Sequence, residues 1–266
     1  MRVRGVLLLL CMAALSGCAG AQFKLPQVTE AEISQASLAV AGKTDSLDVH
    51  ERSDGESREM VEHVTKRLRR VAPEVCQHAE TSCFFNVVYV DDDFPNALAL
   101  EGGRIEVYRG LLQYLESEDE LAAVIGHEMG HHIAEHLQEK QQNAAIGAVI
   151  ADILTAGAIA ATGGNSYNPY QAQDTINQSM RLGASIGAIS FSKEQEREAD
   201  LVGAYLLERA GYNLFRAGRL YEVISAMDDK TRSSWLDTHP AGPERVAAWQ
   251  KAIMEVRQSE DLLPDQ

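Results

Sequence analysis

Apolar and polar residues alternate along this 266-residue chain with periods that predict helices around a short sheet. Residues 56–71 have the amphipathic pattern of a helix. Residues 84–90, rich in aromatic and β-branched side chains, predict a buried strand, and residues 96–100 and 104–108 predict a hairpin around residues 101–103. The predicted fold class is therefore α+β, mainly helical, with a small sheet.

Two capping boxes mark the starts of long helices in the second half of the chain. Ser117 is followed three residues later by Glu120, which predicts a helix from about residue 118 through residue 136 or beyond. Ser192 with Gln195 predicts the start of another. In each box the hydroxyl and the carboxylate or amide satisfy backbone N–H groups that a helix start leaves without partners.

The first eighteen residues differ in composition from the rest of the chain. Arg2 and Arg4 precede an apolar stretch, residues 6–15, that is too short to span a bilayer as a stable helix. This pattern predicts a signal peptide over residues 1–17. The residues up to Cys18 resemble the cleavage box of bacterial lipoproteins, in which the cysteine is lipidated; an ordinary secretory signal with an incidental cysteine is the alternative.

If Cys18 is lipidated, the signal peptide ends at residue 17. Residues 18–55 then form the anchor, a tether and a first helix, and residues 56–266 form the main domain. The residue after the cysteine is Ala19, and in Gram-negative bacteria a residue other than Asp there usually implies sorting to the outer membrane. The resemblance thus implies a lipid-anchored protein on the periplasmic face of the outer membrane. The inner membrane stays open as an alternative.

The net charge limits the classes of partner that the protein can bind, and its cysteines bear on the redox compartment. The formal net charge of −15 and a pI near 4.9 argue against a nucleic-acid partner, because phosphate binding needs clustered Lys and Arg. Once Cys11 and Cys18 are assigned to the signal and the anchor, Cys76 and Cys83 remain. An oxidising compartment favours a disulfide between them, with two unpaired thiols as the alternative.

The strongest chemical signal is the run from His127 through Glu128 to His131. Residues four apart share one face of a helix, so the two imidazoles can reach one metal ion. A tetrahedral zinc then needs a third protein ligand, often a carboxylate, and an open position for water. Glu128 has the place of the general base that takes a proton from that water. Downstream, Glu194, Glu196 and Glu198 are all candidates for the third ligand, and spacing alone does not choose among them.

Several segments together resemble the HtpX and CAAX-prenyl-protease type of zinc metallopeptidase, within it the periplasmic BepA/LoiP-like branch. The resemblance covers about residues 56–257 and rests on residues 96–97, 103–112, 127–132 and 192–200. It implies a zincin-like domain with one Zn²⁺ per chain, held by His127, His131 and Glu196. It also implies that Asp200, one turn after Glu196, orients a ligating histidine.

A further match lies near the C-terminal end, at residues 238–240 and 244–245. In the BepA/LoiP-like branch the corresponding histidine lies near the zinc, which gives His239 a catalytic or restraining role here. A loop histidine that caps the final helix is the alternative. No counterpart of the C-terminal helical-repeat module of the BepA type is expected, so the resemblance does not imply docking to the outer-membrane assembly machinery.

The predicted strand at residues 104–108 offers a way to bind a protein substrate. If it lies at the edge of the sheet, an extended polypeptide could pair with its main chain at Arg104, Ile105, Glu106 and Val107; an ordinary structural strand is the alternative. The sequence thus predicts a zinc metalloendopeptidase that degrades unfolded or misassembled envelope proteins. A zinc-bound, chaperone-like binding protein is the second hypothesis, although such a protein has no need of Glu128 as a base.

Overall fold

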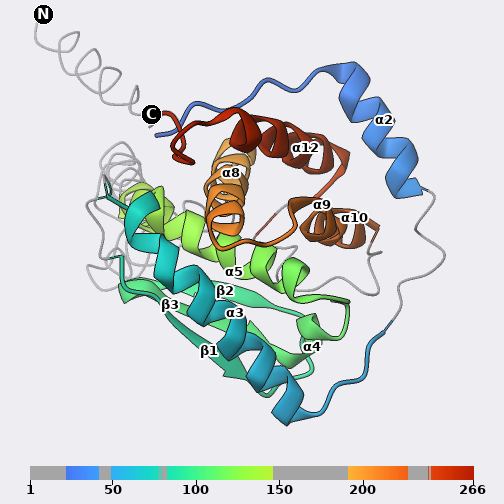
Figure 1. The fold of residues 1–266 in the computed structure, drawn as a ribbon, viewed down its shortest axis with the longest axis vertical. Coiled ribbons are helices and arrows are strands. Elements are labelled where there is room, and N and C mark those ends of the chain that lie inside the picture. Colours follow the sequence, from blue (N-terminus) through green and yellow to red (C-terminus); the bar gives the residue numbers. More distant parts are fainter. Residues whose placement is uncertain are drawn as a thin grey trace, which may run out of the picture.

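The computed structural model describes residues 22–41, 49–77, 79, 83–145, 191–226, 239 and 241–266. The predicted signal peptide and Cys18 lie outside these residues. The described elements are α2 (Glu30–Ala41), α3 (Asp54–Val75), β1 (Asn86–Val90), β2 (Ala97–Leu100), the 3₁₀ turn η1 (Glu101–Gly103), β3 (Arg104–Tyr108), α4 (Arg109–Leu112), α5 (Glu118–Ile133), α8 (Lys193–Arg209), α9 (Leu214–Ala217), α10 (Arg219–Ala226) and α12 (Pro243–Gln258) (Figure 1). The predicted fold class, mainly helical α+β with a small sheet, is confirmed. Among the described helices, none has the length and apolar character needed to cross a membrane.

The sheet has three strands in the order β1-β3-β2. The predicted hairpin is present, since β2 pairs antiparallel with β3 across η1, and β1 pairs with β3 in parallel. Of the two interpretations of residues 104–108, the ordinary structural strand is therefore the one that the described sheet supports, and the edge strand is not. Both sides of β3 are hydrogen-bonded, so Arg104, Ile105, Glu106 and Val107 have no free main-chain edge for a substrate. Within the described sheet, β2 is the outer strand on that side.

Helix α5 is the centre of the molecule, between the sheet and α8 (Figure 1). Every residue from Asp119 to Ile133 is buried. The two helices approach closely because glycines face each other: a Cβ on Gly130 would lie 2.4 Å from the carbonyl oxygen of Ala199, and one on Gly203 would lie 3.1 Å from the carbonyl carbon of Gly126. This close approach brings side chains of α5 and α8 to one point.

The end of α5 differs from the prediction of a helix through residue 136. The helix ends at Ile133, and Glu135 has a positive φ of 58° before a new helical segment starts at His136. A left-handed residue interrupts the ladder of helical hydrogen bonds, and here it is neither Gly nor Asn. His136 consequently leaves the helical position that it would have had on a continuous α5.

The start of α5 has half of its predicted capping box: the Ser117 side chain accepts a hydrogen bond from the Glu120 N–H, while the Glu120 carboxylate accepts from the Glu116 N–H. Helix α8 has a complete capping box between Ser192 and Gln195. Beyond α8 lies α12, which also contacts α2, so the first and last described helices cover the same side of the core. Helices α5 and α8 thus lie together between the sheet, which contacts α5, and α12, which contacts α8.

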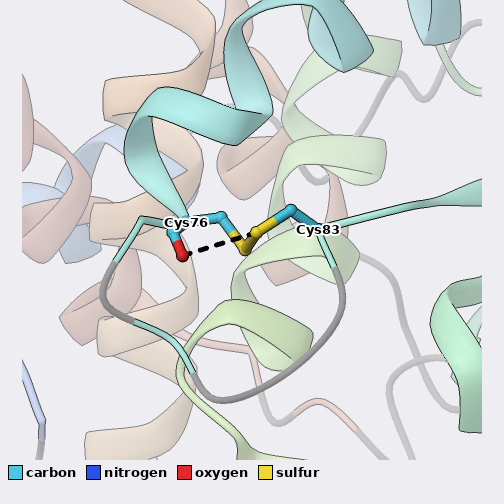
Figure 2. The surroundings of a disulfide bond; sticks show 2 residues. All are labelled: Cys76 and Cys83. Atoms are coloured by element: carbon cyan, nitrogen blue, oxygen red, sulfur yellow. Dashed lines mark hydrogen bonds between the residues drawn. A yellow bond between two sulfur atoms is a disulfide. The ribbon is translucent and has the colours of Figure 1, made fainter.

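A disulfide between Cys76 and Cys83 joins the end of α3 to the segment that leads into β1 (Figure 2). Cys76 is buried, and Cys83 packs against the same core. The bond closes a short loop, with a sequence separation of seven residues. It fixes β1 relative to α3, the helix that packs against this strand.

Candidate metal centre

His127 and His131 lie one turn apart on α5 and direct their Nε2 atoms toward each other, 3.0 Å apart. Both side chains are buried. Glu196, in the first turn of α8, completes the group: its Oε1 lies 3.3 Å from His131 Nε2 and its Oε2 lies 3.5 Å from His127 Nε2. The three residues that the sequence and the family resemblance select therefore meet at one buried point.

These separations fit a tetrahedral metal ion. Zinc binds imidazole and carboxylate at ~2.0–2.1 Å, which places tetrahedral ligand atoms roughly 3.3 Å apart. The ligand atoms of His127, His131, Glu196 and His239 all lie within 4.8 Å of one another. The donor set of imidazoles and one carboxylate is also the set that zinc prefers.

His239 is the fourth member of this group and comes from the segment before α12. Its Nδ1 lies 3.1 Å from His127 Nε2 and 2.9 Å from Glu196 Oε1. Its Nε2 lies 3.7 Å from Glu128 Oε1. The imidazole thus lies between the candidate metal ligands and the predicted base.

Glu128 itself is completely buried on α5, beside the two ligating histidines in sequence. A carboxylate that is shielded from bulk water and lies near a metal can exchange a proton with a water bound there. The structure therefore places a potential base next to the metal ligands. Its catalytic role stays a prediction.

Asp200 fixes the orientation of His127 from behind. Its Oδ1 lies 2.7 Å from His127 Nδ1, so this nitrogen donates to the carboxylate and Nε2 is left to face the candidate metal position. Tyr221 donates a second hydrogen bond to the same oxygen at 2.9 Å. Arg245 donates to both Asp200 oxygens and also lies 2.7 Å from Glu196 Oε2.

The sequence did not predict the hydrogen-bond partners of Arg245, Tyr221 or His136. Arg245 and Tyr221 are buried polar residues in helices whose other inward positions are apolar, and this pattern was the available signal. His136 lies with its Nδ1 2.9 Å from His131 Nδ1. His132, by contrast, faces away from the metal ligands and packs near Phe85.

The electrostatics of the group favour the protonation states that metal binding requires. Burial and the adjacent His127 hold the pKa of His131 well below its usual range, so this imidazole is neutral. Burial alone would raise the pKa of Glu196, but His239, Arg245 and His127 hold it well below its usual range. Asp200 likewise has a lowered pKa, because Arg245 and His127 outweigh the effect of its burial. A neutral imidazole and an ionised carboxylate are ready to bind a cation.

His239 has the opposite shift. Burial would lower its pKa, but the negative charges of Glu196 and Glu128 raise it above the usual value. In the metal-free protein, the imidazole is therefore stabilised as a cation between two carboxylates. A metal ion bound at this point would supply the positive charge that protonated His239 otherwise provides to the two carboxylates.

A cavity of about 290 Å³ lies beside the group. Its wall includes the β2 residues Leu98 and Leu100, the side chains of Lys140 and Phe191, and His239. Phe191 stacks on His131, with ring centroids 3.9 Å apart, so the apolar cavity and the metal ligands share a wall. Beside the metal ligands there is thus space lined by the outer strand of the sheet.

Comparison with known proteins identifies the family. The model of peptidase family M48 matches residues 60–253. The chain is 30% identical over 172 residues to mitochondrial metalloendopeptidase OMA1 of Arabidopsis thaliana, a match that covers 63% of this chain and 32% of that protein. It is 29% identical over 181 residues to metalloprotease LoiP of Escherichia coli (strain K12), with coverages of 68% and 67%.

A third relative is the β-barrel assembly-enhancing protease of the same bacterium, 27% identical over 209 residues, which are 75% of this chain and 42% of that protein. The chain thus spans about a third of the Arabidopsis relative and less than half of this one. The family match includes both metal-binding helices, α5 and α8. The predicted BepA/LoiP-like resemblance is therefore confirmed, and the chain belongs to peptidase family M48.

Proposed function

We propose that this protein is a zinc-dependent endopeptidase of the bacterial cell envelope, with His127, His131 and Glu196 as the zinc ligands. The observation that carries the proposal is the convergence of these three buried residues at one point between α5 and α8, with the buried Glu128 carboxylate 3.7 Å from His239 of the same group. A bound zinc ion supplies Lewis-acid chemistry there, since it polarises a carbonyl oxygen and makes water more acidic.

Glu128 acts as the general base in this proposal. Its buried carboxylate takes the proton from the water that attacks the peptide carbonyl, and then gives the proton to the departing amine. Because peptide hydrolysis releases an amine that must be protonated, one group that first accepts and then donates a proton serves both steps. Asp200 and Arg245 keep His127 and Glu196 in place during this exchange.

His239 restrains the enzyme at rest. Its ring lies between Glu196 and Glu128, with its Nδ1 2.9 Å from one carboxylate and its Nε2 3.7 Å from the other. A substrate carbonyl needs the same space, so the imidazole has to move before cleavage. If the displaced ring instead stabilises the negative charge that develops on the carbonyl oxygen, His239→Ala would slow cleavage.

The substrate is an extended, unfolded segment of protein. The outer edge of β2 lines the cavity beside the metal group, and main-chain pairing along such an edge gives affinity with little dependence on sequence. The role first predicted for residues 104–108 thus moves to residues 97–100. The apolar side chains Leu98, Leu100 and Phe191 favour segments that are buried in folded proteins.

The location is the periplasmic face of the outer membrane, with lipidation at Cys18. The signal-like residues 1–17 support export, and the Cys76–Cys83 disulfide is typical of an oxidising compartment. One relative is named β-barrel assembly-enhancing protease, and together with the predicted export this name favours misfolded or misassembled envelope proteins as substrates.

The test is cleavage of casein, an unfolded protein, by the full-length wild type, Glu128→Gln and His239→Ala in detergent at matched zinc content. We expect Glu128→Gln to lose at least about 100-fold in rate, because a general base contributes 10²–10⁴-fold. His239→Ala should cleave as fast as the wild type or faster. Zinc binding without cleavage by any of the three would favour the chaperone-like hypothesis instead.

A further inference from the structure

His131 belongs to a chain of buried hydrogen bonds that leads away from the metal ligands. Its Nδ1 lies 2.9 Å from Nδ1 of His136. The other ring nitrogen of His136, Nε2, lies 3.0 Å from Oε2 of Glu198 on α8. All three side chains are buried, with exposed fractions of 0%, 1% and 2%. A metal ligand, a second histidine and a carboxylate thus form one continuous path.

The break in the helix after α5 makes this path geometrically feasible. Residues five apart on a continuous α-helix point about 140° apart, because each residue turns the helix by about 100°. The left-handed backbone at Glu135 reorients the chain, and His136 returns to the side of His131. The left-handed backbone at Glu135 therefore gives the candidate metal ligand His131 its hydrogen-bond partner, His136.

Only one arrangement of protons satisfies every bond in the path. His131 needs a free lone pair on Nε2 to bind a metal, so its Nδ1 carries the hydrogen and donates it to His136 Nδ1. His136 then carries its own hydrogen on Nε2, where it donates to the Glu198 carboxylate. Glu198 thereby selects the tautomer of His136, and His136 selects that of His131.

The second oxygen of Glu198 is also used. The backbone N–H of Phe23 donates to Oε1 at 2.6 Å, and Phe23 is buried in the core. Two more bonds hold the same segment: the Lys24 N–H donates to the Asp265 carbonyl at 2.8 Å, and Arg197 donates to the Pro26 carbonyl at 2.5 Å. The path from the metal ligand therefore ends at the N-terminal segment of the described protein.

We propose that the N-terminal segment, residues 22–26, positions the zinc ligand His131 through Glu198 and His136, so that the docking of this segment sets the affinity of the metal centre. The proposal rests on the proposed zinc site. Phe23 is five residues after Cys18, the expected lipidation site. The positioning path thus reaches to within a few residues of the membrane attachment that the sequence predicts.

The test compares the zinc dissociation constants of full-length variants, measured by competition with a chelator of known affinity. His136→Phe keeps a ring of similar size but removes both hydrogen bonds, and should weaken zinc binding about 10- to 100-fold. His136→Asn, whose side-chain oxygen can replace Nδ1 but cannot reach Glu198, should show a smaller loss. The melting temperature of each metal-free variant shows whether it folds.

Phe23 offers a matched pair of variants. Phe23→Pro and Phe23→Ala both lose the ring, but only proline removes the backbone N–H. We expect Phe23→Pro to bind zinc several-fold more weakly than Phe23→Ala. In the His136→Phe background this difference should disappear, because residues on one path give non-additive effects.

Equal zinc affinities for Phe23→Pro and Phe23→Ala, or a difference that persists in the His136→Phe background, would overturn the positioning path while leaving the zinc site intact. A wild-type protein that binds no zinc would overturn both the path and the proposed function. If His136→Phe does not fold, the comparison of His136→Asn with the wild type decides: unchanged zinc affinity contradicts the path. The two proposals therefore fail in distinguishable ways.

Discussion

Asp200 and Arg245 form a bidentate ion pair in the protein interior, directly behind His127, a candidate metal ligand. Arg245 Nε donates to Oδ2 at 2.9 Å and Nη2 donates to Oδ1 at 2.7 Å, while Oδ1 also faces His127. The arginine compensates two buried carboxylates, because it also contacts Glu196. This pair joins α12 to the metal-binding helices and couples the stability of the fold to the geometry of the site.

The substitution Asp200→Asn should therefore act on both properties. It removes the charge that compensates buried Arg245, and breaking one partner of a buried pair costs about 3–5 kcal/mol of unfolding free energy. It also removes the carboxylate that orients His127, which should weaken zinc binding about 10- to 100-fold. Denaturant unfolding of the metal-free protein and chelator competition measure the two effects.

The control for this substitution is Glu244→Gln, which breaks the ion pair between Glu244 and the largely exposed Lys193. Exposed pairs contribute about 0–1 kcal/mol, so its effect should be small and zinc binding unchanged. An Asp200→Asn protein that is as stable as Glu244→Gln would contradict the compensating role of the buried pair.

The lowered pKa of His131 predicts how stability depends on pH. In the unfolded chain this histidine titrates near 6.5, whereas burial and His127 keep its folded pKa well below that value. Below pH 6.5 the unfolded state takes up a proton that the folded state does not. The unfolding free energy of the metal-free protein should then fall as pH decreases, by up to about 1.4 kcal/mol per pH unit from this residue.

The measurement is denaturant unfolding of the metal-free wild type and His131→Gln from pH 7.5 to pH 5. The variant lacks this titration, so the difference in unfolding free energy should change in favour of the variant as pH decreases below 6.5. A difference that stays constant over this range would show that His131 has an ordinary pKa in the folded state.

The close approach of α5 and α8 predicts that Gly130→Ala destabilises the protein. The added Cβ would lie 2.4 Å from the carbonyl oxygen of Ala199, which is backbone and cannot rotate away. Separation of the helices should cost about 1–3 kcal/mol and also weaken zinc binding, since Glu196 is on α8. Denaturant unfolding and zinc competition test this.

Gly55→Ala is the matched control. Gly55 lies in α3, where the nearest atom to an added Cβ is Ser53 Oγ at 3.9 Å. Alanine is a better helix former than glycine, so this variant should be unchanged or more stable by up to about 1 kcal/mol. If both variants had the same stability, helix contact at Gly130 would not limit the fold.

The sequence was sufficient for the parts of the site that depend on local geometry. His127 and His131 follow from a spacing of four residues on a helix, and the capping boxes located the starts of α5 and α8. Glu196 needed the family resemblance as well, because spacing alone does not choose among Glu194, Glu196 and Glu198 on the same helix. The structure separates them: Glu196 faces the metal group and Glu198 faces His136.

The parts that the sequence did not predict depend on long-range neighbours. Alternation along residues 104–108 shows which side chains face the core, but it does not show that β1 pairs with the other side of β3. The left-handed Glu135 has no glycine or proline to mark it. Arg245 is 45 residues from Asp200 in sequence, so only the packing of α12 against α8 reveals their pairing.

The most direct test of the central claim is the zinc content and casein activity of three full-length proteins: wild type, Glu196→Gln and Glu128→Gln. The account predicts about one zinc per chain in the wild type and in Glu128→Gln, weakened zinc binding in Glu196→Gln, and cleavage at the normal rate by the wild type alone. Full activity in Glu128→Gln, or zinc affinity in Glu196→Gln equal to that of the wild type, would contradict it.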